Sequence, residues 1–227
     1  PPPPPPPPPF FQAEDGIRDR GKSLVGSEMC IRDSILPVTL GGDREELREF
    51  VARDDEVDQL HGEIVTYLGR VSQETLTGGQ KDELLKLMEA TNDLENIGDI
   101  IETNLVSLGH RRLDEGAHVS ASTAGVLEEF HLAVSRALDM ALVAVSQKNE
   151  AAAAEVVDMK TEMNQLADSA HLHEAKRLIA QEPGRLPAYT FEVDVLESLK
   201  RVYYFTKRMA RAALPSADIR PEKTDRA

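Results

Sequence analysis

The chain has 227 residues, one cysteine, no tryptophan and 4% aromatic residues, and its formal net charge at pH 7 is −14. Because phosphates would be repelled by that charge, neither a nucleic acid nor an anionic membrane is expected as a direct partner. No apolar run approaches the ~20 residues that a membrane helix needs. The many Ala, Leu and Glu residues favour helix over strand throughout.

Residues 1–34 differ from the rest of the chain. Nine prolines come first, and such a run is an extended segment without packing. The sequence after them resembles translated sequencing-adapter readthrough, so residues 1–34 are interpreted as non-native and disordered. They contain Cys30, the single cysteine of the chain. The remaining domain therefore has neither a disulfide nor a thiolate metal site.

From residue 35 onwards, apolar residues at three- and four-residue spacing predict long helices divided by loops. The first two apolar stripes lie at residues 57–71 and 84–108, and a polar loop is expected at residues 109–122. A third helix follows at residues 123–148, and a fourth carries the stripe at 156–170. Pro183, Gly184 and Pro187 then break the chain. The fifth helix contains Val195 and ends at Pro215, and residues 215–227 form a disordered tail.

A weak internal repeat relates the two halves of the chain. Residues 56–60 align with 162–166, and residues 94–97 align with 199–202. The sequence therefore predicts an all-α, elongated bundle of two three-helix repeats, at residues 35–110 and 123–214. The first helix of repeat one is largely missing, because its expected place at roughly residues 17–42 is rich in glycine. The last turns of that helix are expected to resume near Ile35.

A missing helix would leave a groove in the first repeat. We therefore expect four apolar residues there to be less buried than four residues at the corresponding level of the second repeat. The first set is Leu60, Ile64, Leu87 and Leu94, and the second is Leu166, Ala170, Leu199 and Val202.

Two acidic pairs stand in the first repeat, Asp54 with Asp58 and Glu95 with Asp99. Each pair has the four-residue spacing that places both carboxylates on one helix face. A short turn after the first pair makes the two helices antiparallel. Residues at equal distances from that turn lie side by side, which predicts that Asp58 is level with Asp93. The four carboxylates would then share one level of the bundle.

Carboxylates held together repel each other unless they take up protons or a cation. One hypothesis is a site for a divalent or trivalent metal ion, with Asp54, Asp58, Glu95 and Asp99 as ligands. The alternative is a solvated acidic face of a charged helix pair. The second repeat lacks the necessary charge, so a metal site is expected in the first repeat only. Its corresponding residues are Lys160, Asn164, Lys200 and Tyr204.

The two acidic pairs and the five helices follow one another in an order that resembles the PhoU family. The resemblance covers roughly Asp43 to Leu214. The family's second acidic segment reads Glu-Arg-x-Gly-Asp, and Asn96 stands here in place of the arginine. The resemblance implies two three-helix repeats, a part in the control of phosphate uptake and no chemical turnover. Consistent with this, the chain has no nucleophile with a plausible base and no glycine-rich phosphate loop.

The second half, with the segment from Glu197 to Tyr204, is most similar to the cytoplasmic C-terminal region of bacterial sodium/phosphate cotransporters. This implies a regulatory domain at the cytoplasmic face of the bacterial inner membrane, partnered in cis by a membrane transport domain. The fragment itself is expected to be soluble, and homo-oligomers are a further expectation. Two alternatives stay open. One is a free-standing PhoU-type regulator that contacts a phosphate transporter and a sensor kinase, and the other is a metal-dependent enzyme built on the carboxylates.

Overall fold

The computed structural model describes residues 35–179 and 185–214, except for the side chains of residues 53, 54, 56 and 57. The expectations for residues 1–34, for residues 215–227 and for the break at Pro183 and Gly184 lie outside the described residues. Within them the chain is helical with short loops and contains no strand. The predicted all-α fold is confirmed.

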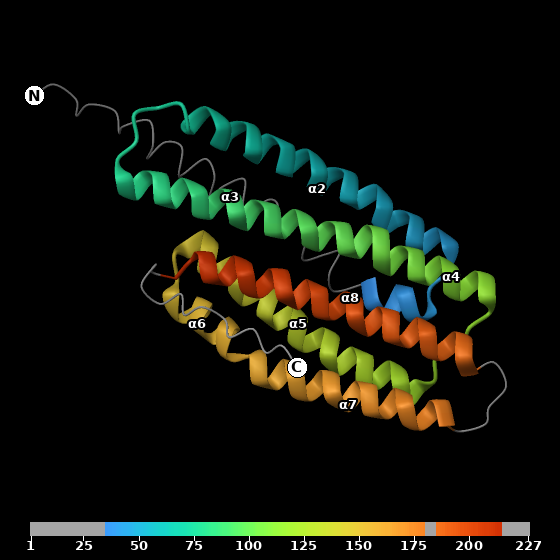
Figure 1. Ribbon diagram of the computed structural model, residues 1–227. Helices are drawn as coiled ribbons and strands as arrows, with labels where there is room; N and C mark the ends of the chain where they lie inside the picture. Colours follow the sequence, from blue (N-terminus) through green and yellow to red (C-terminus); the bar gives the residue numbers. More distant parts are fainter. Residues whose placement is uncertain (1–34, 180–184, 215–227) are drawn as a thin grey trace, which may run out of the picture.

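A short helical segment at residues 35–41 precedes α2 (Arg44–Val71), which is followed by α3 (Gly78–Asp99). Without a break, α3 continues through the π-helical segment η1 (Ile100–Val106) into α4 (Ser107–Glu115). The second half consists of α5 (Ala121–Gln147), α6 (Glu150–Asp158), α7 (Lys160–Ile179) and α8 (Arg185–Ala212). The α2 and α3–α4 rods form one side of an elongated bundle, and α5 to α8 form the other (Figure 1).

Three predicted boundaries need correction. The loop expected from residue 109 begins only at Gly116, because the helix continues through α4. The predicted fourth helix is divided at Met159 into α6 and α7. Pro187 does not break the chain but is the third residue of α8. An N–H group there would have no partner within the helix, so proline is tolerated at that position.

Local sequence signals fix where the first-repeat helices begin and end. Asp43 caps α2 by accepting the N–H groups of Glu45 and Glu46, and the Glu46 side chain accepts the Asp43 N–H at 2.8 Å. Thr77 and Gln80 form the same reciprocal cap on α3. Each such cap satisfies backbone donors that the first helical turn leaves unpaired. At the other end, α4 ends at Gly116, whose φ of 61° is favourable only for glycine or asparagine.

The apolar stripes predicted from the sequence form the core. They pack with a close approach of α2 to α4, where a Cβ atom on Gly109 would lie 2.6 Å from Leu47 Cδ2. The described stripe residues that are buried are Ile64, Leu68, Val71, Leu84, Leu94, Ile97, Ile101, Leu105, Leu108, Leu127, Phe130, Val134, Leu138, Leu142, Val156, Met159, Met163, Ala170, Val195, Leu199, Val202, Thr206 and Met209.

The η1 segment widens the helix where the short segment at residues 35–41 packs. Its Ile100, Ile101, Leu105 and Val106 are all buried. π-Helical turns are rare and occur mostly as single-turn bulges inside α-helices. The Thr39 hydroxyl donates to the Leu105 carbonyl at 3.3 Å. This contact gives a partner to a carbonyl inside the widened stretch and fixes the short segment in place.

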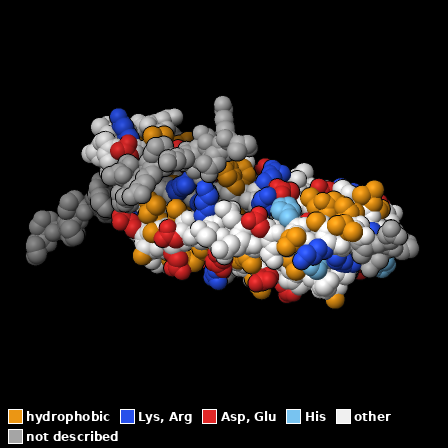
Figure 2. Space-filling model, turned by 60° about the horizontal axis from the view of Figure 1, so that its bottom comes forward, with side chains coloured by type: hydrophobic (Ala, Val, Ile, Leu, Met, Phe, Trp, Pro, Cys, Tyr) orange, Lys and Arg blue, Asp and Glu red, His pale blue; other side chains and the backbone are white. Residues whose placement is uncertain are grey.

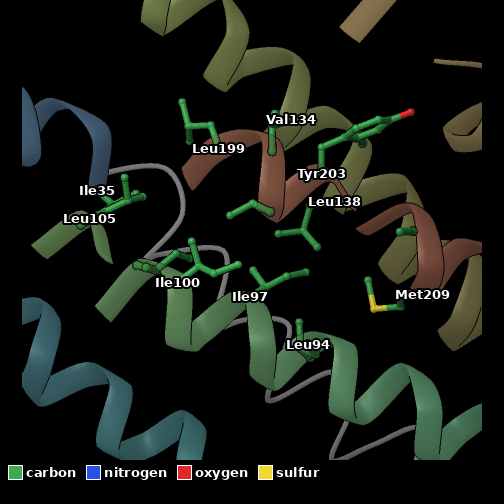
Figure 3. Packing of buried hydrophobic residues seen from close by; sticks show 14 of the residues in the cluster. Ile35, Leu94, Ile97, Ile100, Leu105, Val134, Leu138, Leu199, Tyr203 and Met209 are labelled. Atoms are coloured by element: carbon green, nitrogen blue, oxygen red, sulfur yellow. The ribbon is translucent and has the colours of Figure 1, made fainter. Parts of the chain in front are cut away.

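Four apolar residues of the first repeat were predicted to be less buried than the second-repeat set, and at three of them this is wrong. Ile64 and Leu94 are buried, as are the corresponding Ala170 and Leu199, and Leu60 is half-buried like Leu166. Leu87 is half-buried and has no aligned residue in the second set, because Val202 aligns with Ile97, which is buried as Val202 is. For Leu94 the reason is α8, which packs directly on α3. Figure 3 shows Leu94 and Ile97 of α3 and Ile100 of η1 pointing toward side chains of α5 and α8.

Candidate functional site

Three of the four predicted acidic residues come together between α2 and α3. The Asp58 side chain hydrogen-bonds the Glu95 carboxyl, and Asp99 lies close enough to act on Glu95 through its charge. The Asp54 side chain lies outside the described residues. His61, one turn along α2 from Asp58, places its Nδ1 atom 3.3 Å from Glu95 Oε2. Asp58 and Asp99 are exposed, while Glu95 is half-buried at the centre of the group.

The environment of Glu95 favours a bound proton. Partial burial is the largest cause that raises the pKa of this carboxyl, and the charges of Asp58 and Asp99 raise it further. His61 acts in the opposite direction and lowers it. A hydrogen bond in which the protonated Glu95 carboxyl donates to Asp58 also raises the pKa. Uptake of a proton by Glu95 would relieve the repulsion. This is one of the two ways in which clustered carboxylates can be stabilised.

Asp93, which was predicted to be level with Asp58, does not join the acidic group. Asp58 lies beside Glu95 and not beside Asp93, which turns away to face α8. Asp93 is 2% exposed, and its Oδ1 lies 3.3 Å from Arg208 Nη2. Burial raises the pKa of Asp93 to about 6, although Arg208 opposes the rise. Counting residues from a turn gives the height on a helix but not the rotation about its axis, and rotation separates these two neighbouring acids.

Among the described residues, no group of three or more His, Cys, Asp or Glu side chains is placed to hold a metal ion. The donor types nevertheless suit a cation, because carboxylate oxygens bind hard divalent ions and imidazole binds transition metals. The metal site at Asp54, Asp58, Glu95 and Asp99 stays a prediction. As the side chains lie, the described members form an acidic cluster in which the pKa of Glu95 is raised.

Two second-repeat counterparts of the acidic residues, Lys200 and Tyr204, make contacts of other kinds. Lys200 pairs with Glu197 of the same helix at 2.7 Å. Tyr204 is 50% exposed, and its ring lies against Phe205 and beneath the guanidinium of Arg208. The cation–π contact at 5.8 Å is a surface packing arrangement.

A charged cluster that the sequence analysis did not predict lies between α7 and α8. Arg185 donates two hydrogen bonds to Glu192, at 3.0 and 2.6 Å, and both residues are buried. Glu174 of α7 is 1% exposed, and neither of its oxygens has a hydrogen-bond partner among the described residues. His171 lies 3.6 Å from both Glu174 and Glu197, too far for hydrogen bonds. The sequence carried one signal, since Glu174 follows the buried Ala170 by four residues.

Burial is the largest cause that raises the pKa of Glu174, to about 7, and the neighbouring charge of Glu192 raises it further. Arg185 opposes the rise, but its two hydrogen bonds go to Glu192. A buried carboxyl without a hydrogen-bond partner is more stable in its neutral form. The bundle thus holds a proton on Glu174 at pH values where an exposed glutamate would be ionised.

No helix among the described residues is long and apolar enough to cross a membrane.

Comparison with known proteins supports the fold and identifies a family match in the first half. Residues 33–104 match the family model described as "PhoU domain". The structure is similar to the crystal structure of PhoU from Pseudomonas aeruginosa, with a TM-score of 0.81 and 15% sequence identity. That similarity covers 90% of this chain and 96% of the Pseudomonas chain. A comparison with curated proteins found no match. The chain therefore has a PhoU-like fold.

We expect Glu174→Gln to stabilise the protein in a pH-dependent way. The pKa of Glu174 rises from 4.5 to about 7 on folding, so the folded state binds the proton more tightly. The free energy of unfolding of the natural chain should fall as pH increases from 4.5 to 7 on account of this group. The variant should avoid that loss and be more stable by up to about 3 kcal/mol at pH 8, with little difference at pH 4.5.

Urea unfolding at several pH values measures the difference. Glu129→Gln is a matched control, because Glu129 is exposed on α5, and it should change stability by less than about 0.5 kcal/mol. An equal effect of Glu174→Gln at all pH values would show that Glu174 does not hold the proton.

Proposed function

We propose that this chain is a regulatory, non-catalytic domain that takes part in the control of inorganic phosphate uptake. The observation that carries the proposal is the match of residues 33–104 to the PhoU domain, in a chain whose fold resembles PhoU over 90% of its length. Additional support comes from the acidic cluster of Asp58, Glu95 and Asp99. It lies in the matched region, at the positions where the sequence pattern predicted a functional site.

In its more specific form, the proposal is that the chain is the cytoplasmic domain of a sodium-dependent phosphate transporter. The segment from Glu197 to Tyr204, which carries that resemblance, runs along α8. A membrane transport domain in cis would be the partner, and the domain would act at the cytoplasmic face of the inner membrane. The alternative is a free-standing regulator that acts on a separate transporter.

The upstream coding sequence of an intact copy of the gene distinguishes the two forms. Several apolar spans of about 20 residues before the region of residue 35 would support the transporter form. A short upstream sequence that completes the first helix of repeat one would support the free-standing form.

We expect the domain to control transport and not to carry it out. In the transporter form, an intact gene copy and a copy without the region of residues 35–214 should both support sodium-dependent uptake of labelled phosphate. Growth in high phosphate should lower the initial uptake rate of the intact protein only. In the free-standing form, deleting the gene should remove the same response from the transporter that remains. An unchanged response after deletion would contradict the regulatory proposal.

A metal ion at the acidic cluster is the second part of the proposal. Asp58, Glu95, Asp99 and Asp54 would supply oxygen ligands, with His61 close to Glu95. A bound cation would neutralise carboxylates of both α2 and α3 and so hold the two helices together. Since the pKa of Glu95 is raised, a cation would have to compete with a proton for this carboxylate. The affinity should therefore fall as pH falls.

Titration calorimetry with Mn²⁺ or Zn²⁺ tests the metal proposal. Binding should disappear in the double variant Asp58→Ala with Glu95→Ala, because too few anionic ligands remain to offset dehydration of the ion. Asp55→Ala with Asp82→Ala is the matched control, since both residues are exposed on the same two helices. The control should retain the affinity of the natural chain. Equal binding by both double variants would contradict the assigned ligands and favour a solvated acidic face.

A further inference from the structure

A polar pocket of about 370 Å³ lies between the η1–α4 rod of the first repeat and α8 of the second. The buried side chain of Leu108 forms part of its wall. The remaining wall is polar and comes from both helices. The pocket is separate from the acidic cluster between α2 and α3, whose described members do not line it.

The two walls have a fixed register. The η1–α4 rod and α8 run antiparallel (Figure 1), and Arg111 Nη2 donates to Asp194 Oδ2 at 2.6 Å. With this pair at one end, equal steps along the two helices place Ser107 opposite Ser198 and Asn104 opposite Arg201. These residues all line the pocket. The register therefore places Asn104 and Arg201 at the end away from the ion pair, with Ser107 between that end and Arg111.

The acceptor groups of the pocket are already engaged. Asp194 Oδ2 receives the hydrogen bond from Arg111. Glu197 Oε1 pairs with Lys200 at 2.7 Å and also faces His171. Each carboxylate is thus balanced by a basic group of the protein, and neither needs a ligand to neutralise it.

The donor groups, in contrast, are available. Arg201 is exposed and makes no ion pair or hydrogen bond with any described residue. The side-chain amide of Asn104 and the hydroxyl of Ser107 likewise make no hydrogen bond within the described structure. A guanidinium has five N–H donors in a planar fork that matches the oxygens of carboxylate and phosphate groups. The pocket therefore offers uncommitted donors and an uncompensated positive charge at one end.

We propose that this pocket binds a small oxyanion, with Arg201 as its principal ligand and Asn104 and Ser107 as additional donors. The anion would carry a phosphate or a carboxylate group, since both present acceptor oxygens at the spacing of the guanidinium fork. The net negative charge of the chain does not exclude binding of an anion at this pocket. Basic and acidic side chains are interspersed on the face shown in Figure 2, so the charges within a Debye length determine local attraction.

The location gives the pocket a structural consequence. It spans η1–α4 and α8, which belong to different repeats, so an anion held by donors from both helices would join the two halves of the bundle. The inference does not depend on a role in phosphate uptake. A carboxylate ligand would support it as well as a phosphate ligand would.

NMR titration of the full chain with inorganic phosphate and, separately, with succinate tests the proposal. The ionic strength is held constant with sodium chloride. We expect the Asn104 side-chain amide signal to shift with at least one of the two anions. Arg201→Gln should weaken the apparent affinity by about tenfold, and Asn104→Ala by a smaller factor.

Arg136→Gln is the matched control, because it removes the same charge from an exposed residue that pairs with Glu162 on the other side of the bundle. It should change the affinity less than about twofold. A response to phosphate alone would identify a phosphate ligand, and a response to succinate alone a carboxylate ligand. No shift at about 20 mM of either anion, or equal weakening by Arg201→Gln and Arg136→Gln, would overturn the proposal.

Discussion

The packing of α8 against both halves of the molecule is the interaction on which the structure depends. On one side α8 meets α3, where Ile97 is fully buried, and on the other it meets α5 and α6. Its Phe191 and Leu196 are fully buried, and the Tyr203 hydroxyl donates to the Val156 carbonyl at 3.1 Å. At roughly 25 cal/mol per Å² of buried apolar surface, a helix enclosed in this way contributes to the stability of both repeats at once. It explains why a first repeat with a short first helix still has a buried core.

The same packing determines where charged groups can lie. Asp93 faces Arg208 across the α3–α8 contact, and Arg111 faces Asp194 farther along it. Side chains that rotate away from α8, such as Glu95 and Asp99, gather instead on the side toward α2. The α8 packing thus separates the acidic cluster within the first repeat from the polar pocket between the repeats.

Much of this arrangement could be predicted from the sequence, because three- and four-residue apolar spacing is a property of the helix alone. The stripes were predicted correctly, whereas the site at Asp54, Asp58, Glu95 and Asp99 stays a prediction. Features that depend on rotation about a helix axis, or on packing between residues remote in sequence, could not be predicted. Asp93 and Glu95 are two residues apart, and only the position of α8 decides which one it buries. The η1 widening, the continuation into α4 and the buried Glu174 likewise depend on neighbouring helices that are remote in sequence.

Some signals were nevertheless present. Glu174 and Glu192 stand one helical turn from the core residues Ala170 and Val195, and a charged residue in that place needs a partner or a proton. The antiparallel match of Arg111 with Asp194 could not be read before the fold was known, because the two residues belong to different repeats. Charge pairs between residues remote in sequence can therefore be predicted only when the packing is known. Helix caps and apolar periodicity depend on neighbouring residues alone.

Native-state amide hydrogen exchange tests the central role of α8 most directly. If α8 makes the two repeats one cooperative unit, amides of α3 around Leu94 and Ile97 should exchange with the same opening free energy as those of α8 around Leu199 and Val202. The values should agree within about 1 kcal/mol and respond equally to denaturant. A first repeat that opens several kcal/mol below α8, with its own dependence on denaturant, would contradict the account.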